Sequence, residues 1–430
     1  MEEIEVFGFD DFSVEMQDFE VRKTRKFDRM WKVEMGGSIC QAPMVHAGIV
    51  YFGSCNQHVY AVNAENGKLV WKFKTFGIIL YSSPVFWKDT IFIGSYDFNM
   101  YAIDAKSGEL KWKFKTDGEI AVTPCVEDGK VFFGSKDQNV YCVDGETGKL
   151  LWKFKTNDEV IAAPNIHKGK LFIGSFDKNL YCLDANTGRL IWKFATQGEI
   201  LNITPILIND GVVYFSSFDN NIYAVEEQTG KLIWKFTTGT YGNSGNPVIH
   251  RGMLFHASRD GNLYALTLDG RLIWKFTNKE HLSTPVFFED KIFTGSEDFN
   301  LYCISLQGKK LWSFKTESIV FQKPVVHDGK VLAPSWDCNL YAINIETHDL
   351  AWKFRAEGSP SYLPPPYESF EVVMKIPARD IEEEKKKQYD FGSREEEHNV
   401  SAYKSRITYQ LSTHYREKGK YQVDSREEEF

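Results

Sequence analysis

The sequence predicts an all-β protein, an eight-bladed β-propeller made of four-stranded antiparallel blades. Tryptophan recurs nine times at intervals of 38 to 42 residues, at Trp31, Trp71, Trp112, Trp152, Trp192, Trp234, Trp274, Trp312 and Trp352. Each interval holds four short runs rich in Val, Ile, Phe and Tyr, and no helical period of 3.6 residues competes with them. Four short strands per forty residues, repeated eight times, are typical of blades that close into a ring.

One unit shows how each predicted strand is justified. Its four runs cover residues 123–126, 131–135, 140–144 and 150–154, with Gly, Asn or Asp in the turns between them. The third turn contains Gly148, and a glycine recurs there in seven copies, because a tight hairpin needs a positive φ. The eighth copy, residues 346–349, has no glycine, so we expect a looser turn there.

The repeat also carries a family resemblance. Residues 142–152, Cys-Val-Asp-Gly-Glu-Thr-Gly-Lys-Leu-Leu-Trp, and residues 102–112 resemble the Ala-x-Asp-x-x-Thr-Gly-x-x-x-Trp repeat of the PQQ-like propeller family. That family includes quinoprotein alcohol dehydrogenases and outer-membrane assembly lipoproteins of the BamB type. The resemblance covers about residues 27–356 and implies the propeller fold. It says little about function, because the repeated residues serve packing.

The domain organisation follows from where the repeat begins and ends. We expect an acidic and aromatic N-terminal arm at 1–26, the propeller at 27–356, a Pro-rich linker at 357–366 and a charged, strand-bearing C-terminal extension at 367–430. Nine tryptophan strands exceed the eight that the blades need. Either residues 27–33 or residues 351–354 complete the last blade, and we favour the N-terminal strand.

The secondary structure of the C-terminal extension is predicted mainly from two apolar stretches. Residues 367–376 and 401–411 predict strands, and residues 381–387 a short charged helix. The second predicted strand places four residues on one face: Tyr403, Ile407, Tyr409 and Leu411. An extension with so few apolar residues makes a marginal core of its own. It could dock on the propeller, pair with a second copy in a homodimer, or be a solvated tail.

Composition and charge exclude several classes of protein. The net charge is −8, which argues against a broad surface for nucleic-acid phosphates. No apolar run approaches the roughly 20 residues of a membrane span. The first twenty residues hold eight acids and no Lys or Arg, unlike a secretory signal, so we expect a cytoplasmic protein. The seven cysteines form no CxxC motif, and we interpret them as reduced structural thiols.

Motifs for catalysis or metal binding are missing from the sequence. It has no GxxxxGK[ST], HExxH or GxSxG motif, and it lacks the adjacent cysteine pair that the quinoprotein resemblance would imply. We therefore predict no enzyme, no catalytic residues, no cofactor and no metal. Four histidines recur at the first turns, namely His46, His167, His250 and His327, on blades too far apart for one metal. An aspartate repeated in seven second turns is interpreted as a turn former.

Recognition residues are expected where the repeats differ. The position before the repeated aspartate varies most, reading Cys55, Tyr96, Lys136, Phe176, Phe218, Arg259, Glu297 and Trp336. A meander places these turns and the connections between blades on one face, so these side chains should ring one mouth of the propeller. We take as candidate partner-binding residues Tyr96, Lys136, Phe176, Phe218, Arg259, Glu297 and Trp336, with Tyr241. The alternative is that each aromatic side chain covers its neighbouring blade.

The connections add further residues to the predicted mouth. Tyr81, Asn243 and Phe321 lie on them, and the connection at 238–246 is expected to be the loosest and most polar. A lysine follows seven of the eight repeated tryptophans from Trp71 to Trp352. These lysines suggest a basic belt, but on outermost strands they also block edge-to-edge aggregation, which is the interpretation we favour.

The leading functional hypothesis is a non-catalytic, cytoplasmic, protein-binding adaptor or regulator. Its acidic charge and arm suit a basic protein component of a large assembly, such as the ribosome. A homodimer formed through the extension would bridge two copies of that target. One alternative is a small-ligand sensor or quinoprotein-like enzyme that uses the mouth, and another is a nucleic-acid-binding protein.

Overall fold

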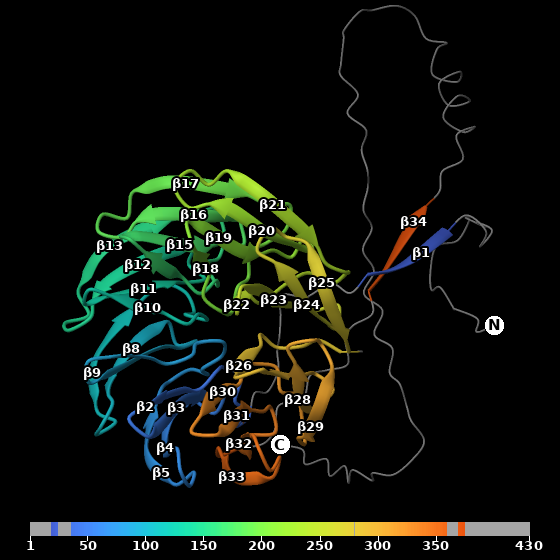
Figure 1. Cartoon of the computed structure of the whole chain (residues 1–430). Coiled ribbons are helices and arrows are strands. Elements are labelled where there is room, and N and C mark those ends of the chain that lie inside the picture. Colours follow the sequence, from blue (N-terminus) through green and yellow to red (C-terminus); the bar gives the residue numbers. More distant parts are fainter. Residues whose placement is uncertain (1–18, 25–35, 279, 359–368, 375–430) are drawn as a thin grey trace, which may run out of the picture. The chain divides into compact units, whose positions relative to one another are not determined.

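The computed structural model describes residues 19–24, 36–278, 280–358 and 369–374, and these contain 34 strands and no helix (Figure 1). They fall into two units: the propeller, within Lys32–Tyr362, and a terminal unit built from Met1–Trp31 and Leu363–Phe430. The propeller has eight sheets of four antiparallel strands, and every sheet consists of four consecutive strands. The predicted fold class is therefore confirmed.

The first four blades follow the chain in order. Blade 1 is β2 (Met44–His46), β3 (Ile49–Ser54), β4 (His58–Asn63) and β5 (Leu69–Lys74). Blade 2 is β6 (Val85–Trp87), β7 (Thr90–Gly94), β8 (Asn99–Asp104) and β9 (Leu110–Lys115). Blade 3 is β10 (Cys125–Glu127), β11 (Lys130–Gly134), β12 (Asn139–Asp144) and β13 (Leu150–Lys155). Blade 4 is β14 (Asn165–His167), β15 (Lys170–Gly174), β16 (Asn179–Asp184) and β17 (Leu190–Ala195).

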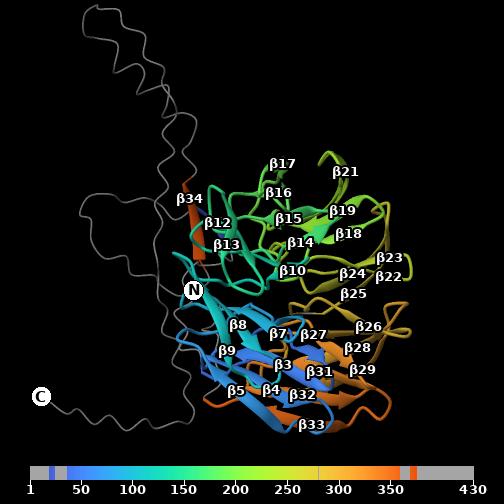
Figure 2. The same ribbon diagram turned by 90° about the vertical axis from the view of Figure 1, so that its left-hand side faces the viewer.

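The last four blades complete the ring. Blade 5 is β18 (Leu207–Asn209), β19 (Val212–Ser216), β20 (Asn221–Glu226) and β21 (Leu232–Thr237). Blade 6 is β22 (Val248–His250), β23 (Met253–Ala257), β24 (Asn262–Thr267) and β25 (Leu272–Thr277). Blade 7 is β26 (Val286–Phe288), β27 (Lys291–Gly295), β28 (Asn300–Ser305) and β29 (Lys310–Lys315). Blade 8 is β30 (Val325–His327), β31 (Lys330–Pro334), β32 (Asn339–Asn344) and β33 (Leu350–Arg355), and it lies beside blade 1 (Figure 2).

The core of the propeller lies between neighbouring blades. Phe132 and Cys142 of blade 3 pack against Leu171 and Ile173 of blade 4, and similar clusters fill the other junctions. Cys142 is fully buried on β12 opposite Trp152, and Cys182 and Cys303 occupy the same place in their own blades. A small side chain is needed there because the indole covers it, so the structural interpretation of these three cysteines is confirmed.

Each junction is closed by a tryptophan on the outermost strand. The Nε1–H of Trp152 donates to the carbonyl of Ala185 in the next blade at 3.0 Å. The indole lies so close to Gly188 that a Cβ there would be 2.7 Å from Cε3 of Trp152. The turn glycine is thus required both for its positive φ and for the approach of the indole. The same arrangement recurs at seven of the eight junctions.

The junction between blades 7 and 8 is the exception. His348 takes the place of glycine with φ 66°, and its ring lies 4.8 Å from that of Trp312. The turn keeps its hydrogen bonds, from Asn344 N–H to Asp349 O at 2.9 Å and from His348 N–H to Asn344 O at 3.0 Å. The prediction of a looser turn was therefore wrong. The histidine does change the contact made by Trp312, because the buried Nε1–H of this indole has no protein hydrogen-bond partner.

The ring closes without a shared strand. β33 completes blade 8, so the favoured closure by residues 27–33, which lie outside the described residues, was wrong. Trp352 explains this, because its Nε1–H donates to Ala64 O of blade 1 at 3.1 Å, as in the other junctions. The chain before blade 1 adds a hydrogen bond from Ser38 Oγ to Trp336 O at 2.6 Å. At the other end, Asn56 Nδ2 donates to Glu357 O at 2.8 Å.

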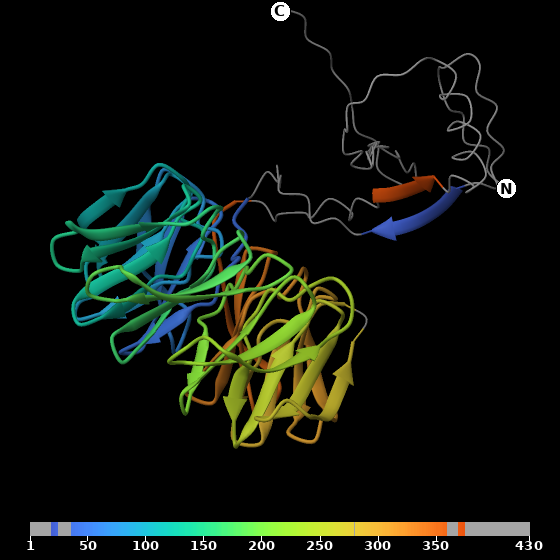
Figure 3. The same cartoon turned by 90° about the horizontal axis from the view of Figure 1, so that it is seen from above.

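The terminal unit contains a two-stranded antiparallel sheet. β1 (Phe19–Thr24) pairs with β34 (Ser369–Met374), with Phe19 opposite Met374 and Thr24 opposite Ser369 (Figure 3). A strand within residues 367–376 was expected from the sequence, and its pairing with the N-terminal arm was not. The predicted strand at 401–411 and the predicted helix at 381–387 lie outside the described residues.

Candidate functional site at the mouth of the propeller

The variable turns and the connections between blades share one face, as predicted. The backbone N–H of the variable residue donates to a carbonyl of the connection that leads into the same blade, as from Tyr96 to Ile78 O at 3.0 Å and from Phe176 to Glu159 O at 2.9 Å. We call this the upper face. We call the eight variable residues the mouth ring: Cys55, Tyr96, Lys136, Phe176, Phe218, Arg259, Glu297 and Trp336.

A carboxylate clamp supports the mouth ring from below. In blade 4, Asp177 Oδ1 accepts the N–H of Asn179 at 3.0 Å, and Oδ2 accepts the hydroxyl of Tyr181 at 2.5 Å. Oδ2 also accepts the N–H of Asn157 in the connection at 3.1 Å. The same aspartate position in seven blades is filled by Asp97, Asp137, Asp177, Asp219, Asp260, Asp298 and Asp337. Their interpretation as turn formers is confirmed.

The clamp also shifts acid–base equilibria. Burial by itself would raise the pKa of Asp298, but hydrogen bonds from Tyr302, Asn300 and Asn278 outweigh it and hold the pKa below its ordinary value. Burial, together with the hydrogen bond to Asp298, raises the pKa of Tyr302. The carboxylate is therefore kept charged and the phenol protonated, which is the pair of states that the hydrogen bond needs.

Members of the mouth ring contact one another and the connections. The ammonium of Lys136 lies 4.7 Å from the centre of the Tyr96 ring, and the guanidinium of Arg259 lies 5.5 Å from that of Phe218. Cys55 and Trp336 are buried, with 1% and 2% of their surface exposed. At these two blades the side chains are buried, whereas the six other members are half-buried at the upper surface.

Aromatic side chains from the connections span the mouth. Tyr81 precedes blade 2 and Phe321 precedes blade 8, and their rings lie 6.3 Å apart although blade 1 stands between their blades. Phe321 also contacts Trp336 at 6.1 Å and His281 at 5.0 Å. His281 Nδ1 in turn lies 3.3 Å from Glu297 Oε1. The opening is thus lined by aromatic rings with a histidine–carboxylate pair beside them.

The connection at 238–246 is anchored rather than loose, so that expectation was wrong. Gly242 N–H donates to Asn220 Oδ1 at 2.7 Å, and Asn246 Nδ2 donates to Thr204 O at 2.7 Å. Tyr241 lies on the same connection with φ 87° and is 48% exposed. These hydrogen bonds use polar side chains of the connection and of the neighbouring blade to pair backbone groups. They also fix the connection that carries Tyr241 at the surface.

Beneath this connection the interior of blade 6 is polar. His256 is fully buried, and its Nε2 lies 2.9 Å from Asn243 Oδ1. Burial lowers the pKa of His256 to about 3, so the imidazole is neutral. The equivalent position on the second strand holds Ile93, Phe133 and Ile173 in blades 2, 3 and 4.

Sequence reasoning missed a set of buried polar groups near the mouth. Eight side chains below the upper face have an atom without a protein partner: Gln41, Asn202, Asn243, Ser244, His256, Gln322, Trp336 and Asn339. They belong to blades 1, 5, 6 and 8 and the connections leading into them. Part of the signal was present in the sequence, because Gln41 and Gln322 stand two residues before a proline, where blades 3 and 4 have Val122 and Ala162.

The repeated histidines lie in separate blade junctions. His46 stacks on Phe86 at 3.7 Å. His250 stacks on Phe287 at 4.4 Å. His167 Nδ1 lies 3.0 Å from Oε2 of the buried Glu227, without the alignment of a hydrogen bond. Within the described ranges, no three His, Cys, Asp or Glu side chains are grouped as a metal site would need.

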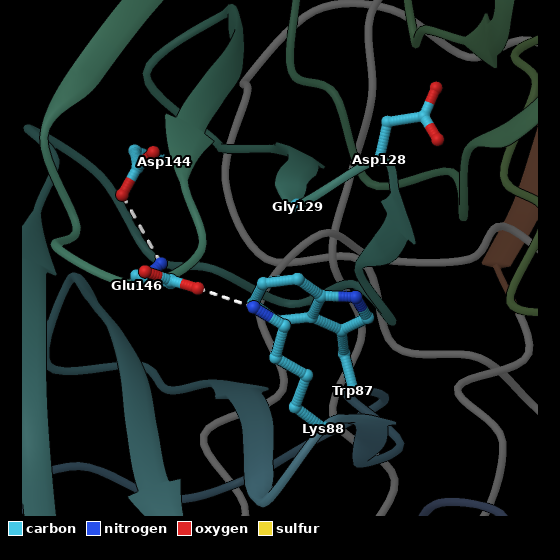
Figure 4. A pocket seen from close by; sticks show the side chains of 6 residues that line it. All are labelled: Trp87, Lys88, Asp128, Gly129, Asp144 and Glu146. Carbon is cyan, nitrogen blue, oxygen red and sulfur yellow. Dashed lines mark hydrogen bonds and ion pairs between the residues drawn. The ribbon is translucent and has the colours of Figure 1, made fainter.

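A pocket of about 300 Å³ lies on the opposite, lower face between blades 2 and 3 (Figure 4). Its lining residues are Trp87, Lys88, Asp128, Gly129, Asp144 and Glu146. The Lys88 ammonium lies 4.4 Å from the centre of the Trp87 ring and forms an ion pair with Glu146. Because the pocket's cation and aromatic ring already satisfy each other, the upper mouth remains the stronger candidate for recognition.

The remaining predicted site residues, Tyr403, Ile407, Tyr409 and Leu411, lie outside the described residues. No helix in the described part of the chain has the length and apolar character needed to cross a bilayer.

The repeat matches a known family along most of the propeller. The family model described as outer membrane protein assembly factor BamB matches residues 55–163, 136–277 and 259–369. The chain belongs to this family. A search of curated proteins found no match. The BamB-type resemblance recognised in the repeat is thereby confirmed.

Solved structures similar to this BamB-type chain have little sequence in common with it. BamB from Moraxella catarrhalis is 17% identical, with a TM-score of 0.59, over 70% of this chain and 90% of that one. The computationally designed Ika8 protein is 15% identical, with a TM-score of 0.63, over 70% of this chain and 95% of that one. The quinohemoprotein alcohol dehydrogenase ADHIIG from Pseudomonas putida HK5 is 16% identical, with a TM-score of 0.59, over 72% of each chain. These likenesses show the fold alone.

Proposed function

We propose that this protein is a non-catalytic, cytoplasmic adaptor or regulator that binds a protein partner through the upper mouth of its propeller. One observation carries the proposal. The clamp beneath the mouth is nearly invariant from blade to blade, whereas the mouth ring in front of it holds seven different residue types in eight blades. A scaffold that holds different side chains at equivalent places builds an irregular surface, as selective recognition requires.

The chemistry of the mouth suits a protein partner. It presents half-buried Tyr96, Phe176 and Phe218 beside Arg259, and large aromatic and Arg side chains supply most of the energy in protein interfaces. Tyr241 adds an exposed aromatic side chain on an anchored connection. BamB-type propellers commonly mediate protein interactions, which supports a protein partner in general.

The acidic charge of the chain favours a basic partner. The net charge of −8 and the acidic first twenty residues favour a basic protein within a large complex, with the ribosome as the first to test. The C-terminal extension, through Tyr403, Ile407, Tyr409 and Leu411, would make the protein a homodimer that bridges two copies of its target.

The test is affinity capture from native lysate followed by sedimentation. The double variant Phe176→Ala and Phe218→Ala should lose the co-purified partner while keeping the thermal midpoint within a few degrees. A matched control, Leu190→Ala with Leu232→Ala, removes two exposed apolar side chains from outer strands and should keep the partner. Equal partner recovery by both double variants would contradict the proposal.

A second candidate, a small-ligand sensor or quinoprotein-like enzyme that uses the mouth, is favoured by the unpartnered donors near it. Gln41, Gln322 and Trp336 carry buried nitrogen atoms that an acceptor-rich ligand would satisfy. The absorption spectrum of the purified protein and mass spectrometry of its denatured extract test this candidate. A stoichiometric small molecule that Trp336→Phe releases would favour it over the adaptor.

A further inference from the structure

The outermost strands carry a second set of cations that edge protection leaves unexplained. On every outer strand the first and third residues after the tryptophan are exposed. The first is lysine in seven blades, and Ser313 in blade 7. The third residue, taken from blade 1 to blade 8, reads Lys74, Lys115, Lys155, Ala195, Thr237, Thr277, Lys315 and Arg355.

Edge protection does not require the second cation. β17, β21 and β25 are outer edges of the same kind, and they end in Ala195, Thr237 and Thr277. Blades 4, 5 and 6 therefore manage with one lysine, and blade 7 has Lys315 in its place, whereas blades 1, 2, 3 and 8 carry a further Lys or Arg. The additional cations call for a different explanation.

Closure of the ring makes these cations contiguous. Along the sequence they form two separated groups, one in blades 1 to 3 and the other in blades 7 and 8. In the structure blade 8 packs on blade 1, so β29, β33, β5, β9 and β13 follow one another around the outside (Figure 1). We call the exposed cations at the first and third positions after the tryptophan of these five strands the basic arc: Lys315, Lys353, Arg355, Lys72, Lys74, Lys113, Lys115, Lys153 and Lys155.

The second cations of the arc reach toward the upper face. Lys155 Nζ donates to Asp137 O at 2.9 Å, and Lys315 Nζ lies 3.3 Å from Asp298 O, both in turns of that face. Two ion pairs lie within the arc, Lys72 with Glu357 and Lys353 with Glu317. These carboxylates are about two-thirds exposed, so a polyanion can replace them at little cost.

Exposed aromatic rings lie along the same arc. Phe76 is 77% exposed in the connection between blades 1 and 2, with the Lys113 ammonium 5.8 Å from its ring centre. Phe98 is 36% exposed in blade 2 and Phe299 is 37% exposed in blade 7, where Lys315 lies 5.3 Å from its ring centre. Three exposed aromatic rings therefore lie among the cations of blades 1, 2 and 7 on the upper side of the arc.

Phe76 is not needed by the scaffold. Its backbone N–H donates to Asp97 Oδ2 at 2.8 Å, which is the clamp contact that the equivalent residue makes in five other blades. Other blades make this contact from Asp117, Asn157, Gln197, Gly239 and Glu317. A polar residue makes the same contact, so the turn itself does not require the exposed phenyl ring.

We propose that the basic arc with Phe76, Phe98 and Phe299 binds a single strand of nucleic acid. Lysine and arginine neutralise the phosphates, and flat exposed rings stack on unpaired bases, which is the usual combination in proteins that bind single strands. An acidic protein would use the cations but has no use for three exposed rings between them. The arc lies on the outer side of the upper rim and does not depend on the function proposed for the mouth.

Fluorescence anisotropy with oligo(U) and oligo(T) of about twenty nucleotides tests the proposal, at salt concentrations from 50 to 200 mM. The variant Lys74→Thr, Lys115→Thr and Lys155→Thr copies the residue of blades 5 and 6 into blades 1 to 3. It should weaken binding about tenfold or more at 100 mM salt. It should also reduce the slope of log affinity against log salt by about 2, since each phosphate contact on a single strand contributes about 0.7.

Two further variants distinguish binding at the basic arc from nonspecific attraction to any positive charge on the protein. The control Lys193→Ser, Lys235→Ser and Lys275→Ser removes three charges from blades 4 to 6 and copies Ser313, and it should change affinity by no more than about twofold. Phe76→Asn, which copies Asn157, should weaken binding about fivefold or more with an unchanged salt slope.

Three results would overturn the proposal. These are the absence of binding to both oligonucleotides at 50 mM salt, equal losses in the two triple variants, and no effect of Phe76→Asn. Polyglutamate that displaces the oligonucleotides and binds Phe76→Asn as tightly as the wild type would assign the arc to an acidic protein instead. Preference for oligo(U) or oligo(T) identifies RNA or DNA as the ligand, and either one supports the proposal.

Discussion

The two faces of the propeller are built by different rules. On the lower face, seven junctions repeat one arrangement of indole, glycine and carbonyl, and a single methyl group on the glycine would lie 2.6–2.7 Å from the indole. On the upper face, a repeated clamp leaves the residue in front of it unconstrained, and that position holds seven residue types in eight blades. Close packing fixes residue identity, whereas a clamp made with the backbone and one aspartate leaves its neighbour available for recognition.

The largest expected effect breaks the lower face. Gly148→Ala should lower stability by about 2–4 kcal/mol, because the methyl group meets Trp112 at 2.7 Å on a backbone with φ 69°. Gly169→Ala is the matched control, since its φ is 73° and nothing lies within 4 Å of the new Cβ. It should cost only about 1–2 kcal/mol. Urea unfolding measures both, and equal losses would show that the indole contact does not fix the glycine.

The next effect tests the part of the upper face that does repeat. Tyr181→Phe should cost about 1–2 kcal/mol, because it removes a hydrogen bond to the charged Asp177. Tyr241→Phe, on the same face but 48% exposed, is the control and should leave the unfolding midpoint unchanged. If Tyr181→Phe were as neutral as the control, the clamp would not be what supports the mouth.

At the junction of blades 7 and 8 we expect a smaller effect, and here the substitution should stabilise the protein. His348→Gly should stabilise the protein by about 1 kcal/mol, because it removes a side chain from a left-handed backbone and copies the other seven junctions. His348→Ala keeps a side chain at φ 66° and should bring no such gain. Calorimetry measures the thermal unfolding midpoint of both variants. A lower midpoint in His348→Gly than in the wild type would mean that the contact with Trp312 stabilises the protein by more than the backbone strain costs.

The smallest effect concerns pH. The folded-state pKa of Asp298 is depressed, so its contribution to stability is present above the unfolded-state value of about 4 and is lost as the pH falls through the folded-state pKa. Asp298→Asn should therefore lower stability at pH 7 and reduce the further loss between pH 5 and pH 3. Chemical unfolding across that range is the measurement. An acid dependence identical to the wild type would remove Asp298 from the groups that set it.

Much of the fold could be predicted because the information repeats. Trp in all eight blades, with Gly and Asp in seven each, defines strands, turns and a common upper face, so the turn-forming role of the aspartate could be predicted. The structure of the turn at His348 could not be predicted. The sequence shows that a glycine is missing, but not whether the turn or the neighbouring tryptophan changes its hydrogen bonds. The buried pair of His256 and Asn243 was missed for a similar reason, because each looks like an ordinary polar residue until both prove buried together.

The sequence by itself determined the blade number, the turn chemistry and which columns are scaffold, because these depend on contacts within a repeat or between a repeat and the next. Only the tertiary structure decided how the ring closes, which side chains span the mouth and that the cations of blades 7 and 8 continue those of blades 1 to 3. Those features join residues about 300 positions apart, as Trp352 and Ala64 are. No local pattern specifies such a contact, which exists only once the last blade packs on the first.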